Sequence, residues 1–236
     1  MNLRAMLSRT AAVVPVAALS LLLSACGNAG PDVDQTGPDP VLPPQSDALL
    51  PAMNIATPAG WDGDLPTVPQ GFAITPLATG LKIPRQMLVL PNGDILVAEG
   101  AGGHAPALRP KDVIAGYIKG KGKTSVKGGD RVSLLRDADG DGQAELVSEF
   151  ITGLDAPYGL AYADGAIYVA NQDNLMRFPY QEGQTRIAAP GEIVAKLPSR
   201  INHHWTKAMT ASADGSRLYV GIGSNSNVGE RGMEVE

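Results

Sequence analysis

From Val68 onward, apolar and polar residues alternate over short stretches that are separated by turn-forming residues. This two-residue period is typical of half-buried β-strands. Three stretches predict hairpins, each with a strand on either side of a tight turn: Arg85–Gly100, Tyr158–Asn171 and Lys207–Gly223. The stretch FAITPLA, Phe72–Ala78, predicts one more strand. No stretch beyond the N-terminal apolar run has the period of an amphipathic helix, so we expect an all-β fold.

The three predicted hairpins resemble one another in sequence. Their second strands read ILVA, IYVA and LYVG and begin at Ile95, Ile167 and Leu218, at offsets of 72 and 51 residues. A repeat of roughly 40 to 50 residues with several short strands is typical of a β-propeller blade. We attribute the longer first offset to an insertion, Ala101–Asp130, which is rich in Gly and Lys and predicts a long loop. Residues 66–236 have room for about three to four blades, so the sequence predicts an incomplete β-propeller.

The first 25 residues have the layout of a bacterial secretory signal peptide. Arg4 and Arg9 precede an apolar run, Ala11–Leu23, that is too short for a membrane-spanning helix. The run closes with LSAC, which resembles a lipoprotein box, and Cys26 is the single cysteine of the chain. We therefore expect Cys26 to become a lipid-modified N-terminus that anchors the protein to a membrane. The residue after the cysteine is Gly27 and not Asp, which resembles the lipoproteins of the outer membrane. The alternative is ordinary signal-peptide cleavage beside a cysteine that stays unmodified.

Residues 26–65 predict a tether between the anchor and the folded domain. Pro, Gly and Asp dominate this segment and no hydrophobic period survives in it, which is typical of an extended linker. The whole chain carries a net charge of −5, which argues against nucleic acid as a partner because such binders normally present a basic face.

The segment RDADGDGQAE predicts a calcium site. It places three aspartates at alternating positions and follows them with glycine, like the first half of a calcium loop. At position twelve Ser148 stands where an EF-hand has a bidentate glutamate, and the flanks predict strands, so Glu145 or Glu149 would have to supply oxygens. An acidic, solvated turn is the alternative. The predicted Ca²⁺ ligands are Asp137, Asp139, Asp141 and Glu145.

Two adjacent histidines, His203 and His204, precede the third predicted hairpin. A neutral imidazole can act as a general base near pH 7. Trp205 would supply an apolar wall beside it, and Lys207 a cation for an anionic ligand. On residue types alone, a surface loop is the alternative for both histidines. A zinc site has little support, since His104 is the one remaining histidine and no cysteine is available.

The aspartate-rich loop, the string PYGLAY (157–162) and the block HWT…DG…LYV…GSNSN (204–227) resemble the glucose/sorbosone dehydrogenase family. Within that family the chain is similar to the sorbosone-dehydrogenase-like members, which depend on pyrroloquinoline quinone (PQQ). The resemblance covers about residues 68–236. It implies a six-bladed propeller that is often exported and that oxidises an aldose or related sugar, with the quinone as hydride acceptor.

The resemblance also implies site residues. His204 corresponds to the family's general base, and Asp94 and Asn225 correspond more loosely to cofactor-binding positions. Glucose-type members carry an acidic residue where this chain has His203, so the sugar stays open. The family's remaining quinone-binding groups belong to a second half that the chain lacks, so we expect the chain alone to have little or no activity. Electrons would pass to a periplasmic acceptor.

A second function stays open at this point. A non-enzymatic, calcium-stabilised propeller lipoprotein that binds a carbohydrate or a protein would have the same repeats, tether and acidic loop. A reading frame that continues past Glu236 with further blades would favour the enzyme, and a stop there would favour the binding protein.

Overall fold

The computed structural model describes residues 37–41, 55–56, 60, 63–102, 110–123, 127–199, 204–224 and 232–234. The chain divides into two compact units, Met1–Pro58 and Ala59–Glu236. Within the first unit, residues 37–41 are exposed and form no regular element. Cys26 and the predicted signal peptide lie outside the described residues. Among the described residues, no helix has the length and apolar character that crossing a membrane requires.

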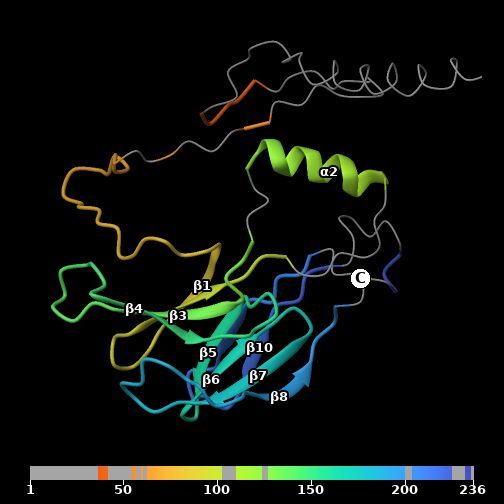
Figure 1. Ribbon diagram of the computed structural model, residues 1–236. Coiled ribbons are helices and arrows are strands. Elements are labelled where there is room, and N and C mark those ends of the chain that lie inside the picture. The colour runs from red at the N-terminus through yellow and green to blue at the C-terminus, as the bar shows by residue number, and fades with distance from the viewer. Residues whose placement is uncertain are drawn as a thin grey trace, which may run out of the picture. The chain divides into compact units, whose positions relative to one another are not determined.

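The first sheet is a four-stranded antiparallel meander (Figure 1). Its strands are β1 (Pro84–Val89), β2 (Ile95–Glu99), β3 (Arg131–Arg136) and β4 (Leu146–Ile151), in that order across the sheet. The predicted Asn-Gly turn joins β1 to β2, and Gly93 there has a φ of 88°, a left-handed conformation that favours glycine. The prediction of a hairpin at residues 85–100 is therefore confirmed.

The second sheet repeats this meander, and a third hairpin follows it. The second sheet consists of β5 (Gly159–Ala163), β6 (Ala166–Ala170), β7 (Asn174–Pro179) and β8 (Glu192–Lys196). The third sheet pairs β9 (Met209–Ala211) with β10 (Leu218–Val220). All three predicted hairpins are confirmed, as β1–β2, β5–β6 and β9–β10. The described residues thus hold two complete four-stranded blades and the first hairpin of a third, an incomplete propeller with somewhat fewer strands than three to four full blades.

The innermost strands of the three sheets lie side by side. β1 contacts β5, and β5 contacts β9. The Gln86 amide on β1 joins all three: its Nε2 donates to the carbonyl oxygens of Leu160 (3.0 Å) and Met209 (2.6 Å). Its Oε1 accepts from the Met209 backbone N–H at 3.1 Å. One side chain therefore satisfies backbone hydrogen-bonding groups of both β5 and β9.

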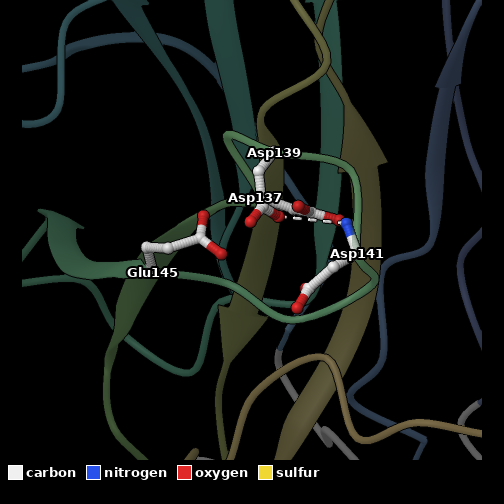
Figure 2. A group of neighbouring side chains, drawn as sticks. All are labelled: Asp137, Asp139, Asp141 and Glu145. Atoms are coloured by element: carbon white, nitrogen blue, oxygen red, sulfur yellow. Dashed lines mark hydrogen bonds between the residues drawn. The ribbon is translucent and has the colours of Figure 1, made fainter.

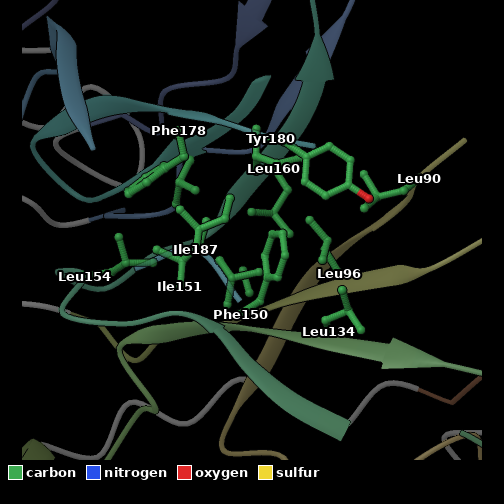
Figure 3. Packing of buried hydrophobic residues seen from close by; sticks show 14 residues of the cluster. Leu90, Leu96, Leu134, Phe150, Ile151, Leu154, Leu160, Phe178, Tyr180 and Ile187 are labelled. Carbon is green, nitrogen blue, oxygen red and sulfur yellow. The ribbon is translucent and has the colours of Figure 1, made fainter. Parts of the chain in front are cut away.

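The main hydrophobic core lies between the first two blades (Figure 3). Phe150 on β4 is fully buried and meets the Tyr180 ring edge-on, with the ring centroids 5.9 Å apart. Each large side chain buried in this way stabilises the fold by about 1.5–3 kcal/mol. Both blades contribute to this core, including Leu96, Leu134, Phe150 and Ile151 from the first and Leu160, Ile167, Val169 and Phe178 from the second. A smaller cluster around Ala161, Leu175 and Met209 joins the second blade to the third hairpin.

The insertion Ala101–Asp130 contains a helix, α2 (Pro110–Lys121), so the expectation that it forms only a loop was wrong. The helix begins with Pro110, which suits the first helical position. Lys119 and Lys121 lie in its last turn, where they interact favourably with the carbonyl end of the helix. Its sequence hid it because Gly116 and Gly120 interrupt a weak apolar period.

The predicted strand at Phe72–Ala78 does not form. Phe72 is 72% exposed and Ile74 is 40% exposed. Among the described residues, the segment has one backbone hydrogen bond to the β3–β4 loop, from the Ala144 N–H to the Leu77 carbonyl oxygen. Alternating apolar residues make a strand only where a neighbouring strand pairs with them, and among the described residues none does.

Candidate functional site

One end of the propeller fragment collects the residues that precede the innermost strands. Pro84 pairs with Glu99, Gly159 with Ala170 and Met209 with Val220, so the three inner strands begin where the second strands end. Gly159 packs directly against the Lys207 carbonyl and the Met209 backbone, which shows that these strand starts lie together. We call this side of the sheets the entry end.

His204 lies at the entry end, just before β9. Its Nδ1 is 2.7 Å from the Ser224 carbonyl oxygen. A carbonyl oxygen can only accept, so Nδ1 carries the proton and Nε2 is the basic nitrogen of the neutral ring. Gly223 allows the two loops to approach closely, because a Cβ at this position would lie 2.5 Å from the His204 Cβ. The hydrogen bond to Ser224 thus sets the tautomer of the neutral ring and orients it.

An arginine and two aromatic rings form a cluster at the entry end, and one of the rings belongs to Trp205, the residue after His204. The Trp205 and Tyr158 rings meet edge-on with centroids 5.8 Å apart. The Arg85 guanidinium carbon lies 5.1 Å from the Trp205 centroid and 6.0 Å from the Tyr158 centroid. Sequence reasoning missed Arg85 and Tyr158. A signal was present, since they occupy equivalent repeat positions, directly after GLKIP and GLDAP.

The backbone leading to these two residues is strained in both blades. Ile83 has a φ of 53° and Ala156 a φ of 45°, and each stands directly before the proline of its repeat. Such a conformation costs a non-glycine residue on the order of 1–3 kcal/mol and is concentrated at functional sites. The two blades therefore keep the same unfavourable turn where they present Arg85 and Tyr158.

Lys207 is almost fully buried below the entry-end loop. Its Nζ donates to the Trp205 carbonyl oxygen at 3.0 Å. Burial lowers the pKa of Lys207. Within the described ranges no carboxylate forms an ion pair with it. The lysine therefore fixes the turn that carries His204 and Trp205.

An open cavity of about 670 Å³ lies beside Arg85 and Tyr158. Its lining comprises Arg85, Gln86, Tyr158 and the segments Ala208–Thr210 and Tyr219–Gly221. Among these described lining residues there is one cation and no carboxylate. The volume lies within the range of about 300–1,000 Å³ that is usual for small-molecule sites. The arrangement suits a ligand with an apolar or aromatic body and negative charge.

Glu99, at the end of β2, is also a buried charge, and sequence reasoning missed it. It accepts hydrogen bonds from Arg131 Nε (2.9 Å), the Ser133 hydroxyl and the Lys82 backbone N–H. Burial raises its pKa, but these three donors outweigh burial and hold the pKa below the ordinary value of 4.5. Arg131 also pairs with Glu149. Glu99 is therefore a structural anion at the entry end, with its oxygens already satisfied.

Asp94 lies at the opposite end, in the turn between β1 and β2, and the structure does not bring it to His204. Its two carboxylate oxygens accept from Arg136 at 2.6 and 2.7 Å, and Asn92 Nδ2 donates at 2.8 Å. The Arg136 hydrogen bonds hold the pKa of this carboxyl below its usual range, against the opposing effect of burial. Its cofactor-binding role stays a prediction, as does that of Asn225, which lies outside the described residues.

The four predicted calcium ligands converge in the β3–β4 loop (Figure 2). Asp137, Asp139, Asp141 and Glu145 each place an oxygen within 4.8 Å of the others. Backbone N–H groups orient them: Gly140 and Gly142 donate to the two Asp137 oxygens at 2.7 and 2.8 Å. Ala138 donates to Glu145 at 2.7 Å. An all-oxygen, acidic set suits Ca²⁺.

This acidic loop cannot serve a ligand at His204. It joins the ends of β3 and β4 that lie beside the start of β2, because Arg136 pairs with Leu146 and Leu135 pairs with both Ile95 and Val147. The loop is therefore at the turn end, with Asp94, and opposite the entry end. An ion held there would stiffen the β3–β4 connection.

A family model described as a domain of unknown function (DUF7133) matches residues 110–234, more than half of the chain. No curated protein matches the chain. Among solved structures, the holo form of the pyranose dehydrogenase PQQ domain from Coprinopsis cinerea is similar, with a TM-score of 0.52 at 16% sequence identity. That similarity covers 70% of this chain and 34% of the other.

A second similar structure is the iodide structure of a Trichoderma reesei protein of Carbohydrate-Active Enzymes family AA12. It has a TM-score of 0.49 at 19% identity and covers 75% of this chain and 37% of that one. The chain thus spans about a third of the length of these solved proteins. The Coprinopsis domain supports the fold, a nearly all-β chain with blades like those of a PQQ domain.

Proposed function

The chain belongs to the family of the domain of unknown function DUF7133, and we propose that it forms part of a PQQ-dependent dehydrogenase that oxidises an aldose or a related sugar, as sorbosone-dehydrogenase-like proteins do. The observation that carries this proposal is the hydrogen bond between His204 Nδ1 and the Ser224 carbonyl oxygen. It supports the assignment of His204 Nε2 as a general base, at the same end of the blades as an anion-compatible cavity lined by Arg85 and Tyr158.

In this proposal His204 removes the proton from the sugar hydroxyl that is being oxidised. Nε2 accepts that proton, while Nδ1–H stays bonded to the Ser224 oxygen and keeps the ring from rotating. The imidazolium that forms then donates through both nitrogens. PQQ, when bound, would supply a two-electron acceptor for the hydride that leaves the same carbon. Proton and hydride thus account for both hydrogens that the sugar loses.

The residues of the cavity fit such a cofactor. PQQ is a planar aromatic ring system with carboxylates, and the cavity offers the Tyr158 ring, apolar groups from Met209 and Val220, and the Arg85 cation. No carboxylate among the described lining residues would repel it. Lys207 fixes the adjacent turn through the Trp205 carbonyl, so the base and the aromatic wall keep their relative positions. We also propose that Ca²⁺ binds the acidic β3–β4 loop and stiffens it.

The proposal extends to the cell envelope. Cys26 would be lipid-modified and would hold the protein at a bacterial membrane, with the outer membrane as the expected site and a periplasmic protein as electron acceptor. The arrangement of Arg4, Arg9, the apolar run and LSAC supports it. The test is incorporation of radiolabelled palmitate in the bacterial host. The wild type should be labelled and Cys26→Ser should not; label in both proteins, or in neither, would contradict the anchor.

The catalytic proposal is tested with protein expressed from its complete reading frame. The purified protein is incubated with PQQ and Ca²⁺, an artificial electron acceptor is added, and dye reduction is followed with sorbosone, glucose and other aldoses. PQQ-dependent turnover of at least one sugar is expected, with a matched reaction lacking PQQ as control. Carbohydrate binding without PQQ-dependent turnover would contradict the proposal and favour the non-enzymatic binding protein.

A further inference from the structure

Arg85 is held in one orientation by three groups. Its Nε donates to the Gly100 carbonyl oxygen at 2.7 Å, and the Tyr158 and Trp205 rings flank its guanidinium. Cation–π contacts of this kind contribute about 0.5–2 kcal/mol each. Ile83, two residues earlier, has a φ of 53°. An arginine on a long, flexible stem is thereby fixed before any ligand arrives, so ligand binding costs it little side-chain entropy.

The terminal nitrogens of Arg85 are not used by these contacts. In the part of the chain that the structure describes, no residue accepts a hydrogen bond from Nη1 or Nη2, and no carboxylate pairs with the guanidinium. Glu99, an acidic side chain of the same end, is already bonded to Arg131. Arg85 also lines the cavity of about 670 Å³. A guanidinium anchored through Nε presents two parallel N–H groups, which match the two oxygens of a carboxylate.

Three other polar side chains of the entry end do not offer this. Lys207 is buried and turns its Nζ to the Trp205 carbonyl. Arg131 has two acidic partners, Glu99 and Glu149. Gln86, which also lines the cavity, uses both ends of its amide on the backbone of β5 and β9. Among the described groups, Arg85 alone combines a fixed position, unpaired donors and access to the cavity.

We propose that Arg85 is the carboxylate-binding residue of this cavity, and that its two terminal nitrogens form a bidentate hydrogen-bonded pair with a carboxylate of a planar ligand. The Tyr158 ring, which lines the cavity, favours a flat, conjugated ligand over a puckered sugar acid, because such a ligand can stack against it. The identification of this carboxylate as one of PQQ rests on the proposed function. The presence of the carboxylate site does not.

The test measures binding to the full chain by isothermal titration calorimetry with three probes: PQQ, benzene-1,3,5-tricarboxylate and D-glucuronate. The variant is Arg85→Gln, which keeps much of the stem but removes the charge and the fork. The matched control is Arg217→Gln, the same change at an exposed arginine near the β9–β10 turn. We expect Arg85→Gln to weaken PQQ and benzenetricarboxylate binding by about 10- to 100-fold, as for the loss of a charged hydrogen-bonded pair. Arg217→Gln should bind as the wild type does, and glucuronate should bind weakly to all three proteins.

The outcomes separate this proposal from the proposed function. PQQ binding that is equal in the wild type and Arg85→Gln overturns the assignment of Arg85 and leaves the dehydrogenase proposal standing. Arg85-dependent binding of benzenetricarboxylate without binding of PQQ supports the carboxylate site and contradicts the cofactor. Tighter binding of glucuronate than of either aromatic probe shows that the site serves an acidic sugar, which overturns the planar ligand. Binding of none of the probes overturns both proposals.

A second measurement needs no variant, and it applies if circular dichroism shows that Arg85→Gln does not fold. Phenylglyoxal modifies accessible arginines, and peptide mass spectrometry reports the extent at each one. We expect PQQ or benzenetricarboxylate to protect Arg85 of the wild-type chain at least several-fold and to leave Arg217 unchanged. Equal modification of Arg85 with and without either probe would overturn the proposal.

Discussion

Replacement of Gln86 by leucine tests whether one amide holds the three sheets together at the propeller axis. Gln86→Leu keeps a side chain of similar size but removes three hydrogen bonds, one to Leu160 and two to Met209. Each neutral hydrogen bond contributes about 0.5–1.5 kcal/mol, and a buried backbone group left unpaired costs about 1–3 kcal/mol. Because Met209 is 3% exposed, water reaches its backbone poorly. We therefore expect a loss of about 2–5 kcal/mol in the free energy of unfolding, a large part of the 5–15 kcal/mol typical of a domain.

The assay is urea unfolding at neutral pH, followed by circular dichroism and analysed by linear extrapolation. The matched control is Gln181→Leu, the same change at an exposed glutamine beyond β7. This control should change the free energy of unfolding by less than about 0.5 kcal/mol. A change in Gln86→Leu as small as that in the control would refute the reasoning. It would mean that the inner strands pack around the axis without this amide.

Three further predictions follow from the entry end and the acidic loop. Glu99 has a pKa held below 4.5, so its ionised form stabilises the fold above that pH, and this stabilisation is lost as the pH falls through the folded-state pKa. Urea unfolding across this pH window should show that the free energy of unfolding falls more steeply in the wild type than in Glu99→Gln, and equal pH slopes would count against the buried pair. In Gly223→Ala the new Cβ would press on the His204 backbone and Cβ, so we expect a folded protein whose rate of sugar oxidation falls by about 10- to 100-fold. An unchanged rate would be evidence against a fixed imidazole. Ca²⁺ should raise the thermal midpoint of the wild type relative to EDTA, by an amount equivalent to about 2.7 kcal/mol when the Ca²⁺ concentration is a hundred times the dissociation constant. Asp139→Asn should reduce this rise, and no calcium effect on the wild type would contradict the metal site.

The blade architecture could be predicted because its signals are local. Gly93 sits in an Asn-Gly turn and Gly165 in an Asp-Gly turn, each between alternating strands, and such turns fix a hairpin without help from the rest of the fold. The recurrence of these hairpins then indicated a repeat. The convergence of Asp137, Asp139 and Asp141 was also readable, since alternating positions in one short loop must lie near one another.

The entry-end contacts could not be predicted because they join residues far apart in sequence. Arg85 meets Tyr158 and Trp205 only after the inner strands assemble, and neither residue type nor spacing reveals that pairing. The repeat GLKIP-Arg and GLDAP-Tyr does mark both positions as equivalent, so comparing the repeats beyond their strands would have found them. Burial of Glu99 was equally hidden, because a glutamate at a strand end reads as exposed until Arg131 and Ser133 are known to surround it.

Two local predictions failed for a shared reason, which is that tertiary context overrides pattern. Phe72–Ala78 alternates like a strand but finds no strand partner among the described residues, and so it stays exposed. Residues 110–121 carry two glycines and a weak period, yet they form α2, helped by Pro110 at its start and lysines at its end.

The central claim is that His204, positioned by Ser224, is the base of a quinone-dependent sugar oxidation, and its most direct test compares two adjacent histidines. His204→Ala and His203→Ala remove the same chemical group at neighbouring positions, in protein expressed from its complete reading frame, reconstituted with PQQ and Ca²⁺ and supplied with a sugar that the wild type oxidises. We measure the rate of sugar oxidation at saturating substrate by dye reduction. We expect a loss of about 100- to 10,000-fold for His204→Ala, as for the removal of a general base, and a much smaller change for His203→Ala. Similar rates in the two variants, or a larger loss in His203→Ala, would contradict it.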